Sequence, residues 1–329
     1  MRIVTSSAAA LLSVAAALAI GTAAVPAAAD AIVVTHWQEI MGGLPWAVAL
    51  DKGYLKQPGL DVTGFVGSKG GGTTIRNIVA SPLPYGEVAP SAAIAAIRSG
   101  VPIKIVNNAV QTVSDFIVAG NKISGVTSLK DLVGKKWGIT SPKSNTDILS
   151  QMILEKAGIP VDKVQRPALG SIMANIQALE SNSIQASFVL EPVWSKYKDK
   201  LVLLLHASDV LPPVLQTVGI ASTAFIAAHP DKIRAIIEAR RKGVDYADRH
   251  PDEAAAILVK YYEGLDPQIA REVTRALLRD HYWSTGAIDL KVLQDTVAGM
   301  KMVGVLNGKV DLGSMVDTSL LPADLKAAD

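Results

Sequence analysis

The sequence predicts an α/β protein with largely parallel sheets. Two observations indicate this class and a third indicates its size. Short apolar runs rich in β-branched residues alternate with segments of helical periodicity along residues 31–208, as is typical of strands connected by helices. From about residue 229 the pattern changes to helices alone. After the first 29 residues, about 300 residues remain, a length that suits two lobes rather than one.

The first part of the alternation consists of strands that are each paired with a helix. A strand at 31–37 (AIVVTHW) precedes a helix at 44–55, and a strand at 60–67 precedes a short helix at 73–82. Pro82 stops that helix because proline cannot continue the backbone hydrogen-bond ladder. Residues 85–110 then supply a turn, a helix of small residues and a further strand.

The second part repeats the pattern and leads into the helical C-terminal region. We expect strands at 135–140, 163–170, 185–192 and 200–208, and helices at 145–158 and 172–181. Apolar positions recur with helical period in four further segments, 229–250, 251–264, 266–283 and 290–304.

The N-terminal 29 residues have the order of a secretory signal peptide. Arg2 is followed by a long run of alanine, leucine and valine, and the segment ends in Pro26 and three alanines at 27–29. This order predicts cleavage after Ala29 and a periplasmic, soluble mature chain. The alternative is an uncleaved anchor helix, because the apolar run almost reaches the length that spans a bilayer. The chain contains no cysteine, which excludes a lipid-anchored lipoprotein, disulfides and cysteine-bound metal.

The net charge and the missing motifs argue against several classes of function. The formal net charge of +2 becomes +1 without residues 1–29, since Arg2 is the charged residue removed. Neither value points to nucleic acid or an anionic membrane as a partner. The histidines lack metal-ligand spacing, so we expect no metal site and no cofactor. The sequence lacks the motifs of common hydrolases, which are Gly-x-Ser-x-Gly, His-Glu-x-x-His and a cysteine nucleophile. We therefore expect that the protein is not an enzyme.

A glycine-rich turn at 64–80 (GFVGSKGGGTTIRNIVA) is the most distinctive local feature. Gly67 and Gly72 have the spacing of a phosphate-binding loop, but Thr73 stands where that loop needs lysine, and the dinucleotide-binding glycine pattern is also absent. The turn still joins a strand to a helix start, whose first N–H groups have no partner within the helix. It therefore suits a polar or anionic group, although an ordinary surface turn with a threonine cap is the alternative.

Other candidate residues follow from the position of loops at strand ends. In open α/β sheets, ligands bind beyond the carboxyl ends of the strands. His36 and Trp37 follow the first expected strand, the glycine turn follows the second, and the segment 86–91 follows the next. In the second half, SPKSNT at 141–146 is the counterpart of the glycine turn, and Glu191 and Trp194 follow a later strand. Two polar helix starts from two lobes make a plausible clamp.

Several segments together resemble the periplasmic solute-binding subunits of ABC importers of the nitrate, sulfonate, taurine and thiamine-precursor class. These segments are LPWAVALDKGYL, PGLDV, GSKGGGTT, LKDLVGKKWGITSPKSNTD and NIQALESNSIQASFVLEPV, and the resemblance covers about residues 32–300. It implies a type II periplasmic-binding fold, in which two α/β lobes are joined by two crossover strands and close over a ligand cleft by hinge motion. We expect the crossovers near 110–117 and 217–226.

The resemblance also implies a division of the chain and a function. Lobe one would comprise residues 31–113 and 220–329, including the C-terminal helices, and lobe two would comprise residues 114–219. The protein would capture a small polar organic solute, such as a sulfonate, carboxylate or heterocycle, and deliver it to an ABC permease and its ATPase. We expect a monomer. A sensory ligand-binding module and a secreted enzyme are the alternatives.

Carried over to this sequence, the resemblance places the ligand among residues of both lobes. These are His36, Trp37, Ser68, Gly70, Gly71, Gly72, Thr73, Glu87, Val88, Ser91, Gln111, Ser141, Ser144, Asn145, Thr146, Glu191 and Trp194. The loops contain Lys69 and Lys143 but no arginine, and their two glutamates disfavour a small doubly charged anion. His36 as an edge histidine, the tryptophans as core aromatics and Glu191 as a helix cap are the alternative interpretations.

Overall fold

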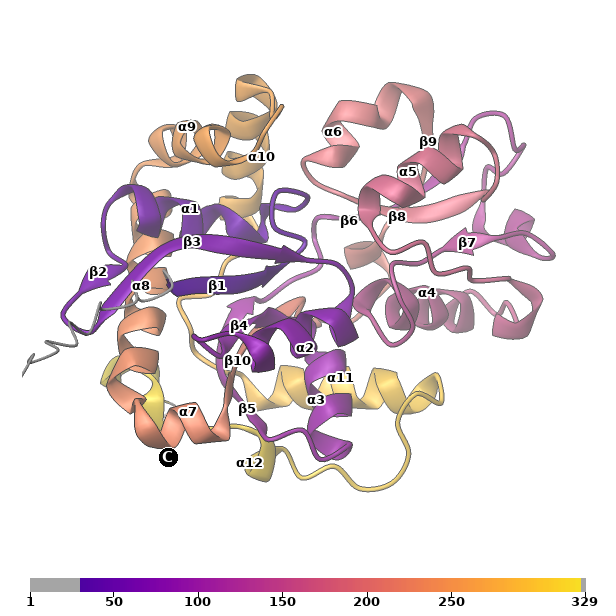
Figure 1. Ribbon diagram of the computed structural model, residues 1–329. Helices are drawn as coiled ribbons and strands as arrows, with labels where there is room; N and C mark the ends of the chain where they lie inside the picture. The colour runs from indigo at the N-terminus through magenta and orange to yellow at the C-terminus, as the bar shows by residue number, and fades with distance from the viewer. Residues whose placement is uncertain (1–29, 327–329) are drawn as a thin grey trace, which may run out of the picture.

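The computed structural model describes residues 30–326, so the signal peptide expected at 1–29 lies outside the described residues. Two β-sheets lie side by side, each with helices packed around it (Figure 1). The predicted α/β class is confirmed. Between residues 30 and 326, no helix is both long and apolar enough to cross a membrane.

The larger sheet contains six strands, in the order β2 (Lys56–Gln57), β3 (Leu60–Ser68), β1 (Asp30–Thr35), β4 (Tyr85–Val88), β10 (Thr217–Ser222) and β5 (Ile103–Val110). Strand β1 is parallel to β3 and β4, whereas β10 is antiparallel to both β4 and β5. The consecutive residues Ile32, Val33 and Val34 of β1 are all buried, because this strand is covered on both faces.

The smaller sheet contains four strands, in the order β7 (Trp137–Gly138), β8 (Ala186–Leu190), β6 (Phe116–Asn121) and β9 (Leu201–His206). Strands β7 and β8 are parallel, but β6 is antiparallel to β8 and β9. Strands β7, β8 and β9 therefore run in one direction, as do β1, β3, β4 and β5 of the larger sheet, so the prediction of largely parallel sheets is confirmed except for β2, β6 and β10. Strands β6 and β10 each follow a crossing from the other sheet, and they lack the helical connection to a neighbour that makes strands parallel.

One expected strand forms only in part. Residues 163–170 contribute isolated bridges, from Gln165 to Lys136 and from Ala168 to Ile139. Pro167 lies between them and has no N–H to donate, so a continuous ladder cannot form there.

The chain passes between the two sheets twice. Residues 111–115 connect β5 to β6, within the segment expected for the first crossover. The second passage is made by residues 207–216, and residues 217–222, expected to cross, form β10 in the larger sheet. Pro212 and Pro213 lie in this passage and cannot donate to a ladder, so regular pairing begins only at Thr217.

Twelve α-helices surround the sheets within residues 30–326. They are α1 (Leu44–Asp51), α2 (Gly71–Ala80), α3 (Pro90–Arg98), α4 (Asn145–Lys156), α5 (Ile172–Glu180), α6 (Val193–Tyr197), α7 (Thr223–Ala228), α8 (Pro230–Arg249), α9 (Pro251–Tyr261), α10 (Pro267–Arg279), α11 (Leu290–Met302) and α12 (Leu312–Met315). The four helices expected after residue 229 are confirmed as α8 to α11.

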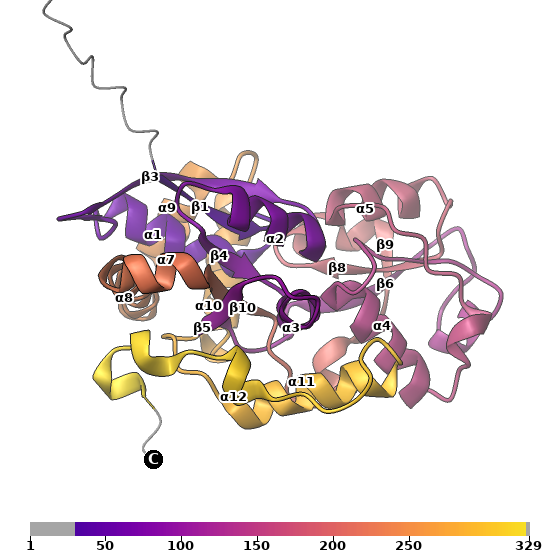
Figure 2. The same ribbon diagram turned by 60° about the horizontal axis from the view of Figure 1, so that its bottom comes forward.

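The C-terminal helices pack in two places. Helices α8 and α9 pack against α1, beside the larger sheet. Helix α11 contacts α3 and also α4, which flanks the smaller sheet, and therefore runs beneath both halves (Figure 2). At Gly299 of α11, a Cβ atom would lie 2.7 Å from Met152 Sδ of α4, so these two helices approach closely.

Candidate functional site

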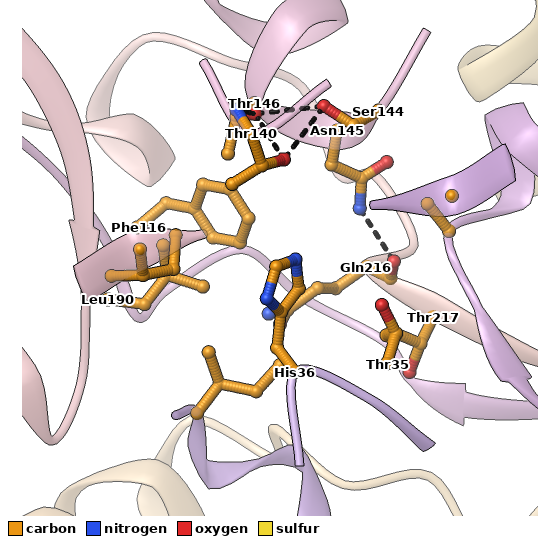
Figure 3. Close-up of a pocket in the computed structure, with 14 residues that line it drawn as sticks. Thr35, His36, Phe116, Thr140, Ser144, Asn145, Thr146, Leu190, Gln216 and Thr217 are labelled. Atoms are coloured by element: carbon orange, nitrogen blue, oxygen red, sulfur yellow. Dashed lines mark hydrogen bonds between the residues drawn. The ribbon is translucent and has the colours of Figure 1, made fainter. Parts of the chain in front are cut away.

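A cavity lies between the two sheets, where strands end and helices begin (Figure 3). It encloses about 420 Å³ of space not filled by atoms, part of it continuous with solvent. The lining residues come from both sheets, from the starts of α2, α4 and α5, and from the second crossing. They are Thr35, His36, Ile40, Gly71, Ala89, Phe116, Thr140, Ser144, Asn145, Thr146, Ile172, Leu190, Gln216 and Thr217.

Three hydroxyl groups form a cluster at the start of α4. Thr140 Oγ1 lies 2.9 Å from Thr146 Oγ1 and 3.1 Å from Ser144 Oγ, and Ser144 Oγ lies 2.8 Å from Thr146 Oγ1. Ser144 also caps the helix by accepting from the Asp147 N–H. Within the described chain, the N–H groups of Asn145 and Thr146 have no acceptor. The helix dipole and these free donors favour a negative or polar group in the cavity.

Hydrogen bonds around the cavity connect α4 to the second crossing and the loop before α4 to the larger half. Asn145 Nδ2, on α4, donates to the Gln216 carbonyl at 2.6 Å (Figure 3). Ser91 Oγ, on α3, donates to the Lys143 carbonyl at 3.1 Å. Gly70 is held at a φ of 77° and lies so close to the smaller half that a Cβ atom there would be 2.7 Å from Ser141 Oγ. The structure is therefore in a closed arrangement.

His36 projects its ring into the cavity from the loop after β1 (Figure 3). Its backbone N–H donates to the Ser68 carbonyl at 2.8 Å, and its φ of 50° turns the chain sharply. Its Nδ1 lies 2.9 Å from Glu39 Oε2. Burial tends to raise the pKa of Glu39, but His36, Lys69 and the Ile172 N–H outweigh burial and lower it. Glu39 is therefore held as a carboxylate.

The cavity has a polar side and an apolar side. Phe116 and Leu190 from the smaller sheet, with Ile40, Ala89 and Ile172, form the apolar side. Among the lining residues in the described chain there is no lysine, arginine, aspartate or glutamate, and His36 is the one lining residue with a basic side chain. Across residues 30–326, no three histidine or acidic side chains lie close enough to hold a metal ion.

Five of the residues selected from the sequence line the cavity: His36, Gly71, Ser144, Asn145 and Thr146. Four others lie beside it. They are Ser68 at the end of β3, Gly70 before α2, Ser91 on α3, and Ser141. The Ser141 hydroxyl is buried and has no hydrogen-bond partner within residues 30–326.

Glu87 does not line the cavity, because it is buried in the larger half and paired with Arg240 of α8. Arg240 Nε lies 2.5 Å from Glu87 Oε1, and both side chains are 1% exposed. Burial raises the pKa of Glu87, and the Arg240 charge opposes that shift. Its neighbour Val88 is fully buried in the core. Glu87 and Val88, the two candidates on β4, are therefore part of the buried interior of the larger half.

Glu191 and Trp194 also lie away from the cavity lining. The Glu191 carboxylate accepts from the backbone N–H of Ser195 at 3.1 Å and from its hydroxyl at 3.0 Å, so it caps α6. Burial raises the pKa of Glu191, and the two Ser195 hydrogen bonds oppose that effect. Trp194 packs, partly buried, against the hydrophobic core.

Four remaining candidates are placed elsewhere. Trp37 packs against Phe65, with ring centroids 4.5 Å apart, in the larger half. Gly72 and Thr73 are exposed on the outer side of α2. Gln111 lies in the first crossing and donates to the His281 carbonyl.

The candidates selected from the sequence did not include most of the apolar lining residues, nor Gln216 of the second crossing. Thr35 and Leu190 are the last residues of β1 and β8, and Thr140 follows β7 by two residues, so the strand-end rule finds them once it covers the last strand residue and the two residues after a strand. Gln216 carries no local signal, because it reaches the cavity only through the path of the second crossing.

The architecture defines the class of protein. Two α/β halves joined by two chain crossings, with a cavity between them, form the periplasmic-binding-protein fold. This fold was expected and is confirmed. A Candida albicans gene product described as having the generic periplasmic binding protein fold matches with a TM-score of 0.71 at 19% identity, over 88% of this chain and 96% of that one.

The sequence comparison identifies a family, which is a more specific assignment than the fold. The NMT1/THI5 like family matches residues 43–254, and the chain belongs to it. A Bacillus subtilis (strain 168) protein named for binding aliphatic sulfonates is 24% identical over 290 residues, which are 86% of this chain and 85% of that protein. The resemblance drawn from the sequence segments is confirmed.

Two further solved structures illustrate the likeness. The alkanesulfonate-binding protein SsuA from Xanthomonas axonopodis pv. citri, bound to MOPS, matches with a TM-score of 0.73 at 15% identity, over 88% of this chain and all (100%) of that one. The nitrate-binding protein NrtA from Synechocystis PCC 6803 matches with a TM-score of 0.70 at 13% identity, over 90% and 86% of the respective chains. At these identities the likeness concerns the fold.

Proposed function

We propose that this protein is the periplasmic substrate-binding subunit of an ABC importer and that it captures a small organic solute with one acidic or polar head. The observation that carries this proposal is the convergence of helix starts from both halves on one cavity. Gly71 of α2, Asn145 of α4 and Ile172 of α5 each begin a helix at the cavity wall. Three positive helix ends favour a ligand group with negative character.

The shape and lining of the cavity support a ligand with two parts. The hydroxyls of Thr140, Ser144 and Thr146 suit the head, and Phe116 and Leu190 on the apolar side suit a short organic body (Figure 3). The names of the relatives also support a ligand with an anionic head, because sulfonate and nitrate are both small anions. The cavity hydroxyls of Thr140, Ser144 and Thr146 bond to one another and so are held in place as a group of binding partners.

Capture would occur by closure of two lobes around the crossings at 111–115 and 207–216. We divide the chain as the sequence suggested, with lobe one at 31–113 and 220–329 and lobe two at 114–219. A ligand that contacts both lobes binds the closed state more tightly and so shifts the population toward it. The closed protein, as a monomer, would then deliver the solute to the permease and its ATPase.

A thermal-shift screen of the chain from residue 30 tests the binding function. The panel contains alkanesulfonates, nitrate, aromatic acids, pyrimidines and amides. A true ligand raises Tm in a saturable manner because it binds the folded state alone, and mass spectrometry should recover it unchanged. If no member of the panel raises Tm at millimolar concentration, or if the ligand returns chemically altered, the proposal is wrong.

The location has its own test. We expect the exported chain to begin at Asp30 and to be released from the periplasm without detergent. N-terminal sequencing of the released protein checks this. Recovery of the intact chain, with Met1, in the membrane fraction would support the uncleaved anchor instead.

A further inference from the structure

The charge of the cavity depends on a single side chain in the described part of the protein. His36 lines the cavity, and no lysine, arginine or acidic residue does. An anion that enters therefore meets hydrogen-bond donors but no fixed positive side chain. It also brings its charge close to the carboxylate of Glu39, the neighbour of His36. The charge balance in the closed cavity thus depends on whether the His36 imidazole carries one proton or two.

Glu39 fixes which nitrogen of the ring faces the ligand. His36 Nδ1 lies 2.9 Å from Glu39 Oε2, and the two side chains are only 12% and 13% exposed. Because a carboxylate can only accept, Nδ1 must donate. The other nitrogen, Nε2, then carries a lone pair in the neutral ring and an N–H in the imidazolium. The neutral ring offers an acceptor to the cavity, whereas the charged ring offers a donor and a positive charge.

The groups around the pair keep Glu39 negative. Lys69 Nζ, after β3, lies 3.9 Å from Glu39 Oε1, and the Ile172 N–H at the start of α5 also lowers the pKa of this carboxylate. Two carboxylates that follow cavity-lining residues in the smaller half are engaged by other groups. Asp147 of α4 lies 2.5 Å from Arg166 Nη1, and Glu191 caps α6. Glu39 therefore contacts His36 directly, and Lys69 acts on the pair through Glu39.

We propose that His36 is a specificity-determining residue, which takes up a proton from solvent when the cavity binds an anionic solute. Glu39 is the positioning residue that orients the ring and stabilises its charged form. The protein consequently binds an anion more weakly as pH rises, while its affinity for a neutral molecule of the same shape stays constant. This inference rests on the proposed binding function and names the ligand class as monoanionic.

Calorimetry with a matched pair of probes tests the inference. The probes are ethanesulfonate and its neutral isostere, ethyl methyl sulfone, each titrated between pH 6 and pH 8.5 in two non-sulfonate buffers of different ionisation enthalpy. We expect ethanesulfonate binding to take up about one proton at the upper end of this range, and its affinity to fall up to about tenfold per pH unit there. The sulfone should show neither effect.

Three variants identify the group responsible. His36→Asn should abolish the proton uptake and lower the affinity for ethanesulfonate at pH 6 by more than about tenfold, with little effect on the sulfone. Glu39→Gln keeps an acceptor for Nδ1 but removes the charge, so the fall in affinity should begin at a lower pH. His229→Asn is the matched control, because His229 is exposed at the start of α8, and the profile should stay unchanged.

The outcomes separate this inference from the proposed function. Sulfonate binding without proton uptake, or binding of neutral members of the ligand panel alone, overturns the role of His36 and leaves the binding function standing. Proton uptake that persists in His36→Asn also overturns it. Failure of every panel member to bind contradicts both proposals.

Discussion

Single residues decide how closely the backbone of α2 can approach the rest of the cavity. Gly71 begins the helix, and a Cβ atom at this position would lie 2.4 Å from the Cβ of Ala92 on α3. Its neighbour Gly72 is exposed, and a Cβ there would meet only Arg76 Nη1, at 3.7 Å. The absence of a side chain is thus required at Gly71, both for helix packing and for ligand access to the helix start.

We expect Gly71→Ala to lower both stability and ligand affinity. Overpacking against Ala92 should cost about 1–3 kcal/mol of unfolding free energy, and the shifted helix start should weaken binding. Adding Ala92→Gly removes the clashing atom and should restore part of the lost Tm. Gly72→Ala is the control: it should leave Kd unchanged and should not lower Tm, because an exposed helical position with room for a Cβ favours alanine over glycine. Thermal denaturation and calorimetry measure both effects, and a Gly71→Ala protein with parental Tm and Kd would contradict this account.

At the scale of elements, the start of α4 combines a structural and a binding role. Ser144 accepts from the Asp147 N–H and lies within the cavity wall. Ser222 caps α7 in the same manner, by accepting from the Phe225 N–H, but does not line the cavity. The two serines therefore separate the contribution of a helix cap from that of a ligand contact.

Both Ser144→Ala and Ser222→Ala should reduce the unfolding free energy by about 1 kcal/mol, because each removes an N-cap. Only Ser144→Ala should also weaken ligand binding, by about three- to tenfold, since it breaks the hydroxyl cluster with Thr140 and Thr146. Urea denaturation and calorimetry provide the comparison. Equal loss of affinity in the two variants would show that the effect comes from helix stability alone.

At the scale of the whole molecule, the two crossings meet at a buried carboxylate. Asp115, in the first crossing, is fully buried and accepts from Tyr282 Oη at 2.8 Å. Gln216 Nε2, at the end of the second crossing, lies 3.4 Å from the same oxygen. Burial raises the pKa of Asp115 to about 7, although the hydrogen bonds from Tyr282 and Gln216 oppose the shift.

This shift predicts how stability depends on pH. In the folded state the pKa of about 7 lets Asp115 keep its proton up to about pH 7, whereas the ordinary pKa of this side chain, as in an unfolded chain, is 3.8. The folded state therefore binds more protons in this window, and the contribution of Asp115 to stability is lost as pH rises from about 4 to 7. Asp115→Asn should remove that part of the decline, and the exposed control Asp162→Asn should not. Urea denaturation at several pH values measures the difference, and parallel profiles for Asp115→Asn and the parent would contradict it.

Lobe closure is the second prediction at this scale. The hydrogen bond from Ser91 to Lys143 joins the two halves, and a ligand between them should add to this contact. We expect small-angle scattering to show a smaller radius of gyration for the saturated protein than for the ligand-free protein. Ser91→Ala, which removes the hydrogen bond to Lys143, should retain an expanded form at ligand concentrations that close the parent. Identical scattering of free and saturated protein would mean that closure does not accompany binding.

The sequence by itself determined the features that depend on local periodicity and on local chemistry. It gave the α/β class, the C-terminal helices and the polar helix starts at Gly71 and Ser144, because apolar spacing and unpaired N–H groups at a helix start are properties of neighbouring residues. Only the tertiary structure decided which side chains reach the cavity. Glu87 does not reach the cavity because it pairs with Arg240, which is 153 residues away in the chain. Phe116 and Gln216 enter it because the two crossings bring them there. These contacts depend on packing between segments that are far apart in the chain, and such packing produces no periodic pattern in the sequence.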